Sequence, residues 1–524
     1  MPNPLSPGVY IEEVSGGVKP IAGVGTSTAA FVGVAEDAKM PDKAVLITNW
    51  NQYVARFGGF IPNGYLPYAV YSFFAEGGSS CFVVGVKPTG ATAASFKSIK
   101  DQNYTDALEI TARSVGNWGN RVEVVVEDAS GNKTANGQWI EEKRFKVIVK
   151  YKEADLFTAE YEGNGIIEVF DQLTFFDIEE KINGRSALIK VQVTLALPTD
   201  EPGILTFKNR LNNGVYQLSG GADNNEGGEG FKSSDFIGDA SNKKGLHAFD
   251  EIDEINIVAI PDMAGNRDVI LNGMNYCKNR KDCFFVADPP HGLTPTQVVQ
   301  FKNAAGNYSG GNVFNSSYGA LYYPWVYIND PATGKRKLVP PSGLVSGTFA
   351  YCDSVRGVHK APAGITDGYL DTAVAIERIV TKGEHDLLNP EKINVIRLLP
   401  EGICIWGART LAADAEWLYI NVRRLMMYIE ESIDEGTQWT VFEPNDPALW
   451  GKVKLNLTAF LTRVWRDGAL FGSTPEEAFF VKVDEENNPP EVRDAGQLIV
   501  EVGVAPVKPA EFVIIQISQK TLQK

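Results

Sequence analysis

A strand-forming stretch stands at each end of this sequence, and neither has an obvious partner strand beside it. The first, SPGVYIEEVSGG (residues 6–17), carries the apolar and aromatic residues that favour a β-strand, and two glycines end it. The second, EFVIIQIS (511–518), follows two prolines. A strand needs partners for its N–H and C=O groups, and no tight turn returns the chain onto the first stretch. The sequence therefore predicts two arms, residues 1–20 and 506–524, whose strands add to a sheet edge of another molecule.

Between these arms the 524-residue chain is too long for one ordinary domain, and roughly two to four domains are expected. Hydrophobic residues make up 44% of the chain, which suffices for sizeable cores. The order of strand-like and helix-like segments along the chain predicts a mixed α/β (α+β) fold interrupted by a β-rich segment. The expected division is residues 1–20 (N-terminal arm), 21–105 (first part of the α/β core), 106–220 (β-rich domain), 221–390 (second part of the α/β core), 391–505 (C-terminal α/β domain) and 506–524 (C-terminal arm).

Hydrophobic periodicity indicates the individual elements. Strict alternation in RVEVVVED and RFKVIVKYKE predicts strands with one solvated face, whereas TSTAAFVGVA, EINIVAIPD and CFFVADPP suit buried strands. Helices are expected at 294–306, 368–383, 410–433 and 447–465, the last two strongly amphipathic. Within the third of these, Arg423 and Arg424 either lie on a solvated helix face or form a docking point for an acidic partner.

Charge and composition exclude several classes of protein. The net charge is −16, with 65 acidic and 49 basic residues, which argues against direct nucleic-acid binding. Five scattered cysteines suit buried free thiols in a reducing cytoplasm. No stretch approaches the roughly 20 apolar residues of a membrane span, and the first residues lack the features of a signal peptide. We therefore expect neither a nucleic-acid partner nor membrane insertion.

Motifs for catalysis or cofactor binding are weak. The four histidines have no metal-ligand spacing, and the chain has no phosphate-binding loop, so we expect no metal and no cofactor. One enzymatic alternative is a serine hydrolase that uses Ser342 or Ser346 with His291 or His359. The surrounding sequence, PPSGLVSGTF, lacks the G-x-S-x-G pattern of a nucleophile elbow. We accordingly expect no catalytic residues.

Several longer segments are specific when taken together. They are PGVYIEEVSGGVKPIAGVGTSTAAFVG, GLHAFDEIDEINIVAIPDM, PPSGLVSGTFAYCDSVRGVHKAPAG, LNPEKINVIRLLPEGICIWGARTL, YINVRRLMMYIEESIDEGTQWTVFEPNDPALW, FLTRVWRDGALFGSTPEEAFFVKVD and GVAPVKPAEFVIIQISQ. The chain resembles the contractile tail sheath proteins of phage tails and related injection particles over nearly its whole length. This resemblance implies a subtilisin-like fold without protease activity in the core, a C-terminal α/β sheath domain that lies innermost, and a surface insertion domain at 106–220.

The same resemblance implies the function. Sheath subunits stack as rings around an inner tube, and contraction drives the tube through a target envelope. The implied partners are other copies of the chain, the inner tube protein, and baseplate and terminal cap proteins. Assembly would take place in the bacterial cytoplasm, within a phage tail or an extracellular or cell-associated injection particle. The rival readings are the serine hydrolase above and a non-contractile structural tail protein such as a tube subunit.

Two sets of residues are the candidate sites. The helix at 447–466 is the expected tube contact, through Lys452, Lys454 and Arg463. The inter-subunit strands are expected to use the apolar residues of the two arms, Val9, Tyr10, Ile11, Val14, Phe512, Ile514, Ile515 and Ile517.

Overall fold

The structure is a computed structural model that describes residues 20–36, 43–61, 64–87, 91–113, 115–131, 144–151, 167–186, 188–195, 210–222 and 231–512. Most of the expected arm strands fall outside the described residues. This holds for Val9, Tyr10, Ile11, Val14, Ile514, Ile515 and Ile517. Phe512, the last residue described, is 71% exposed.

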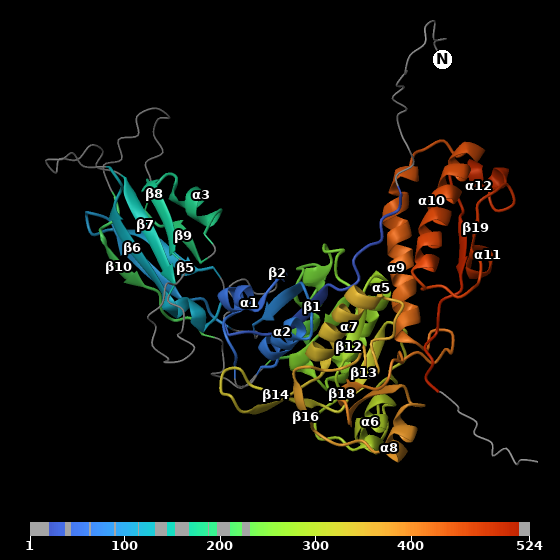
Figure 1. Cartoon of the computed structure of the whole chain (residues 1–524). Helices are drawn as coiled ribbons and strands as arrows, with labels where there is room; N and C mark the ends of the chain where they lie inside the picture. Colours follow the sequence, from blue (N-terminus) through green and yellow to red (C-terminus); the bar gives the residue numbers. More distant parts are fainter. Residues whose placement is uncertain are drawn as a thin grey trace, which may run out of the picture.

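An eight-stranded sheet forms the centre of the molecule (Figure 1). Its strand order is β18-β17-β13-β12-β11-β1-β3-β2, and neighbours run parallel except for β2 and β18 at the two edges. Parallel strands covered on both faces are expected to be apolar, and β1, β3, β11, β12 and β13 contain no charged residue, whereas β17 carries Asn394 and Arg397. The bounds are β1 (Ala29–Val34), β2 (Val45–Ile47), β3 (Cys81–Val86), β11 (Ile257–Ala259), β12 (Phe284–Ala287), β13 (Gly319–Tyr323), β17 (Ile393–Leu399) and β18 (Gly402–Ile405).

Helices α2 and α7 pack against each other and against β1, β11 and β12. Two glycines of α7 allow this close contact, because a Cβ on Gly343 would lie 2.4 Å from the Cα of Ala69, and one on Gly347 would lie 2.6 Å from the carbonyl oxygen of Phe73. The helices of this core are α1 (Trp50–Phe57), α2 (Leu66–Ala75), α4 (Ser233–Ile237), α5 (Arg267–Arg280), α6 (Pro295–Lys302), α7 (Ser342–Arg356) and α8 (Lys382–Leu388).

The prediction of a helix at 368–383 is wrong. Residues Ala373–Ile376 instead form strand β16, which pairs antiparallel with β14 (Val326–Asn329), and β14 also pairs with β15 (Arg336–Val339). The buried carboxylate of Glu76 accepts the backbone N–H groups of Asp371 and Thr372 at 2.9 and 2.8 Å. These N–H groups are therefore bound to a distant carboxylate, and the helix α8 starts only at residue 382.

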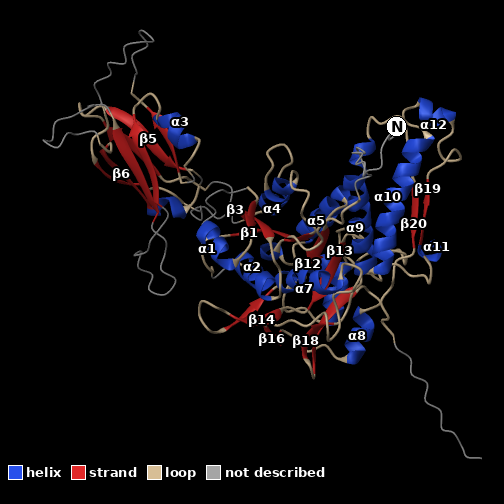
Figure 2. Ribbon diagram, turned by 45° about the horizontal axis from the view of Figure 1, so that its top comes forward, coloured by secondary structure: helices blue, strands red, loops and turns tan. Residues whose placement is uncertain are grey.

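A β-rich module occupies the middle of the chain and has its own core. One sheet has the order β10-β6-β7-β8 and a second the order β4-β5-β9, with α3 beside β8 and β9. The bounds are β4 (Ser95–Lys100), β5 (Asp106–Ala112), β6 (Val122–Asp128), β7 (Phe145–Tyr151), β8 (Ile167–Leu173), α3 (Ile178–Asn183), β9 (Ile189–Val193) and β10 (Gly214–Gln217). Figures 1 and 2 both show this module and the C-terminal helices on opposite sides of the central sheet.

The domain boundaries that follow from the sheets differ from those expected from the sequence. Strand β4 pairs with β5, so the β-rich module begins near Thr92, whose backbone bridges to Ala222 where the chain leaves the module. Strands β17 and β18 belong to the central sheet, although the C-terminal domain was expected to begin at 391. The subtilisin-like character of the central sheet stays a prediction.

The C-terminal lobe consists of four helices and a two-stranded sheet around a third core. Helix α9 begins at Ile420 rather than at 410, because residues 409–419 fold into a loop closed by a hydrogen bond from the N–H of Thr410 to the carbonyl of Leu418 at 2.8 Å. The expected helix at 447–465 is confirmed. The bounds are α9 (Ile420–Thr437), α10 (Pro447–Arg466), α11 (Pro475–Ala478), β19 (Phe479–Lys482), α12 (Pro490–Asp494) and β20 (Glu501–Val504).

Candidate assembly site

The residues that follow the N-terminal arm are fixed to the C-terminal lobe, more than 400 positions away in the sequence. We call residues 20–28 the N-terminal root. Ile21 is only 2% exposed and belongs to the core of that lobe. Arg463 of α10 donates to its carbonyl oxygen, and the N–H of Val24 donates to the Ser432 hydroxyl of α9 at 3.1 Å. The N-terminal arm therefore departs from the C-terminal lobe.

Arg424 of α9 joins the N-terminal root to the central core. Its guanidinium donates to both carboxylate oxygens of Asp353 on α7, at 2.9 and 2.6 Å, and to the carbonyl of Thr26 at 2.8 Å. Both charged side chains are 2% exposed. Burial raises the pKa of Asp353, and the charge of Arg424 opposes this effect.

Both expectations for the arginine pair of α9 are wrong, because neither side chain is available to solvent or to a partner. Arg423 is 6% exposed and its guanidinium carbon lies 3.5 Å from the ring centre of Trp417 and 4.6 Å from that of Tyr318. Burial lowers the pKa of Arg423. Aromatic faces thus take the place of water around this cation.

A second root, residues 505–511, contains the first described residues of the C-terminal arm expected at 506–524. It runs from β20 back to the central core, where Arg409 binds Glu511 through two guanidinium nitrogens, with a distance of 2.9 Å from Nε to Oε1. Their side chains are 12% and 15% exposed. The amide of Asn421 donates to the carbonyl of Val507 at 3.1 Å. The C-terminal root is therefore held at two positions, Val507 and Glu511, by side chains from other parts of the chain.

The two roots meet α9 at opposite ends. Asn421 in its first turn holds the C-terminal root, whereas a Cβ on Gly436 in its last turn would lie 2.7 Å from the side chain of Ile21 in the N-terminal root. Fifteen helical residues separate these positions, about 22 Å along the axis.

The lobe also offers a sheet edge. Strands β19 and β20 pair antiparallel, and no third strand joins them within residues 231–512. A two-stranded ribbon is only marginally stable by itself in water, although this one packs against α10 and α11. Phe480, at the centre of β19, is 58% exposed. These strands can accept another strand along a free edge.

The three expected tube-contacting residues lie on the exposed face of α10. Lys452 and Lys454 flank the exposed Leu455, which retains 63% of its accessible surface. Arg463 differs from them, since its guanidinium binds the N-terminal root and lies 5.8 Å from the ring centre of Phe460.

The serines of the enzymatic alternative are buried within α7. Ser346 donates its hydroxyl to the carbonyl of Ser342 at 2.7 Å, and the N–H of Ser342 donates to Asp288 at 2.9 Å. Burial raises the pKa of Asp288 to about 7. Both serines have 0% exposure, while His291 lies at the surface beside Trp325. Both serines are therefore shielded from solvent.

The described residues contain neither a candidate metal centre nor a membrane-spanning helix. No cluster of three or more histidine, cysteine, aspartate or glutamate side chains there has the arrangement of a metal site. Likewise, none of the described helices combines the length and the hydrophobicity needed to cross a bilayer.

The central sheet, the separate β-rich module and the C-terminal lobe together define a mixed α/β chain whose first and last described segments are both held at α9. Sequence models of two tail sheath domains match this chain: the phage tail sheath protein central domain matches residues 238–411, and the phage tail sheath C-terminal domain matches residues 412–520. Together they cover more than half of the chain. The chain belongs to the phage tail sheath family.

Individual relatives agree with this assignment. The tail sheath protein of Vibrio phage KVP40 is 25% identical over 253 residues, which are 45% of this chain and 36% of the phage protein. The chain thus spans about a third of the length of that curated relative. A sheath complex of an extracellular contractile injection system in the contracted state has a TM-score of 0.58 at 22% identity, over 98% of both chains. A sheath tail protein from Listeria innocua gives 0.59 at 12% identity, over 93% of this chain and 96% of its own. The two structures confirm the mixed α/β fold.

Proposed function

We propose that the chain is the structural subunit of a contractile sheath. Copies polymerise as a helical array around an inner tube, and contraction drives the tube through a target cell envelope. Family membership supports the class, and the position of the two roots at opposite ends of α9 supports the mode of linkage. A contact made by different surfaces of two identical molecules is heterologous and builds an open helical array.

The linkage in this proposal is strand exchange. The arm residues Val9, Tyr10, Ile11 and Val14 of one neighbour, or Phe512, Ile514, Ile515 and Ile517 of another, add to a free edge of the β19–β20 ribbon. An extended arm of 19 residues reaches about 60 Å. The arms can therefore stay paired while the globular bodies rotate between two discrete packings, each subunit contributing only a small free-energy difference.

The remaining partners follow from the same proposal. Lys452 and Lys454 on α10 face the inner tube, while Arg463 acts mainly on the N-terminal root. Baseplate and terminal cap proteins bind the ends of the array, and assembly takes place in the bacterial cytoplasm. The subunit carries out no catalysis, in keeping with the complete burial of Ser342 and Ser346.

Deletion of residues 1–15 tests the linkage. The truncated chain should fold, with an unchanged circular dichroism spectrum, but remain a monomer. Ile11→Pro should act in the same direction because proline cannot donate to a strand ladder. Asn3→Pro, placed between two prolines outside the predicted strand, is the matched control and should assemble. Normal sheaths from the deletion variant in electron micrographs would refute strand exchange by this arm.

Charge reversal tests the tube contact. Lys452→Glu combined with Lys454→Glu should give sheaths without tubes, since both side chains lie on the exposed face of α10. Lys278→Glu on the exposed face of α5 serves as the control. Negative-stain electron microscopy measures the fraction of filled sheaths, and an unchanged fraction would exclude this face of α10 as the tube contact.

A further inference from the structure

A groove with a volume of about 640 Å³ lies beside the C-terminal root. The root forms one wall, ending at Phe512, and the other walls come from α8, Arg397 of β17 and the segment after β18 that contains Trp406 and Ala408. Trp406 is 38% exposed and Phe512 71% exposed. The volume falls in the range of sites that bury most of a ligand's surface.

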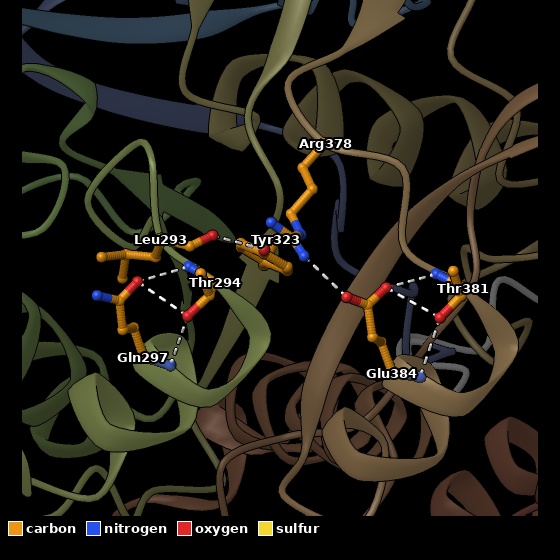
Figure 3. A network of polar contacts seen from close by, with 7 residues as sticks. All are labelled: Leu293, Thr294, Gln297, Tyr323, Arg378, Thr381 and Glu384. Carbon is orange, nitrogen blue, oxygen red and sulfur yellow. Dashed lines mark hydrogen bonds and ion pairs between the residues drawn. The ribbon is translucent and has the colours of Figure 1, made fainter.

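The walls of this groove are held in place by polar contacts. Thr381 and Glu384 form a capping box at the start of α8, and Arg378 donates to Glu384 at 2.9 Å (Figure 3). The backbone N–H of Thr381 and the Arg378 guanidinium lower the pKa of Glu384 to about 2. On the opposite wall, Arg409 holds Glu511. The groove is therefore present in the single subunit and needs no neighbour to form.

The described chain ends at this groove, at Phe512 within the C-terminal arm. Because Glu511 is bound to Arg409, the side chain of Phe512 already lines the groove, and residues 513–517 start at its edge. Their sequence, Val-Ile-Ile-Gln-Ile, has no charge and high β-propensity. Such a segment is an aggregation hazard when it is exposed.

We infer that in the unassembled subunit residues 513–517 lie in this groove, against Trp406, and that they leave it when they pair with a neighbouring copy. Five extended residues span about 17 Å, so the segment can reach along the groove without moving its root. Apolar burial against Trp406 provides the attraction. Lys382, Arg397 and Lys508 also line the groove, and an uncharged segment leaves these cations free to remain hydrated.

Disulfide trapping in the full chain tests this position. The five native cysteines are buried and unpaired, so an introduced pair can be followed selectively. Ala363→Cys in the groove is combined with Ile515→Cys in the arm, and Ala495→Cys, exposed after α12, replaces the groove cysteine in the control pair. The monomeric fraction from size exclusion is oxidised mildly and analysed by non-reducing electrophoresis and mass spectrometry.

We expect the groove pair to cross-link within one chain at least about tenfold more than the control pair. Cross-links only between chains would show that the groove receives a neighbour's arm, and equal yields for the two pairs would show that it receives no arm; either result overturns the inference. If the groove variant fails to fold, Lys382→Cys on the exposed start of α8 replaces it.

The inference rests on the proposed function only for the release step. The cross-link is measured on the unassembled subunit, whereas sheath formation is followed separately by electron microscopy. A strong intramolecular cross-link in a chain that forms no sheath would count against the proposed function alone. Normal sheaths from a chain without the cross-link would count against the groove alone.

Discussion

Replacing Arg424 by methionine tests whether the N-terminal root depends on a buried ion pair. The substitution removes two hydrogen bonds to Asp353 and one to the carbonyl of Thr26, at a site where both charged side chains are 2% exposed. A buried carboxylate without a partner costs about 3–5 kcal/mol. Protonation limits this cost, since neutralising a carboxyl with an ordinary pKa of about 3.9 costs about 4 kcal/mol at pH 7. The unpaired carbonyl adds about 1 kcal/mol.

The expected loss of unfolding free energy is therefore about 5 kcal/mol at pH 7. At pH 5 neutralising the carboxyl costs only about 1.5 kcal/mol, so the loss should fall to about 2.5 kcal/mol. The sign follows from linkage: in the variant the pKa of Asp353 rises in the folded state, and its destabilising effect grows as the pH rises. Urea unfolding of the full chain, followed by tryptophan fluorescence at both pH values, measures the difference.

The double variant Arg424→Met, Asp353→Leu is the matched control. With both charges gone, most of the lost stability should return, because an apolar pair of similar volume often replaces a buried ion pair at little cost. A single variant that loses under 1 kcal/mol would refute the reasoning, as would a loss that is the same at pH 5 and pH 7. Hydrogen exchange over residues 20–28 should also accelerate in the single variant.

Three further predictions concern the roots and the packing around them. Burial, followed by the charges of nearby carboxylates, raises the pKa of Glu431 to about 8. The Glu431→Gln variant should therefore become more stable than the native chain as the pH rises from about 4.5 to 8, with no further gain above pH 8. A difference in thermal melting temperature that does not depend on pH would contradict this prediction. Gly343→Ala should destabilise the fold by about 1–3 kcal/mol through its contact with α2. Gly451→Ala, with open space around the added Cβ, should instead stabilise α10 by about 0.5–1 kcal/mol. Urea midpoints of the two variants that move in the same direction would refute the packing argument. Glu511→Arg should release the C-terminal root, seen as faster hydrogen exchange at residues 505–511, and adding Arg409→Glu should restore part of the protection; no restoration would mean that the pair does not hold the root.

Sequence periodicity predicted the elements whose packing is local. The helix at 447–465 combines an aspartate cap, a proline in its first turn and apolar residues at spacings of three and four, and α10 spans Pro447–Arg466. The apolar runs at β1, β11 and β12 were equally clear. The prediction of a helix at 368–383 is wrong because apolar residues occur there at helical spacing without other signals of a helix. Hydrogen bonds from Asp371 and Thr372 to the distant Glu76 decide that conformation, and a local pattern does not contain them.

The sequence indicates arms through Pro/Gly-rich ends around strand-forming residues, but it does not indicate how the roots are attached. The strands of the arms and the tube contact on α10 stay predictions. The expectation that Arg423 and Arg424 lie on a solvated face or form a docking point is wrong. A charged residue is expected at the surface as long as its partners in the fold are unknown. Those partners are Asp353, Thr26 and aromatic rings from other parts of the chain. Only the folded chain brings them within reach.

Arginine holds both roots, and this choice has a physical consequence. Arg424 and Arg463 bind carbonyl oxygens of the N-terminal root, and Arg409 binds a carboxylate of the C-terminal root. A guanidinium stays charged at every physiological pH and donates through several nitrogens at once, so each anchor keeps at least one hydrogen bond if another is strained. Lysine offers a single ammonium group and a more strongly hydrated charge. If the arms link neighbouring copies as proposed, anchors of this kind hold each root in place while the globular bodies rotate.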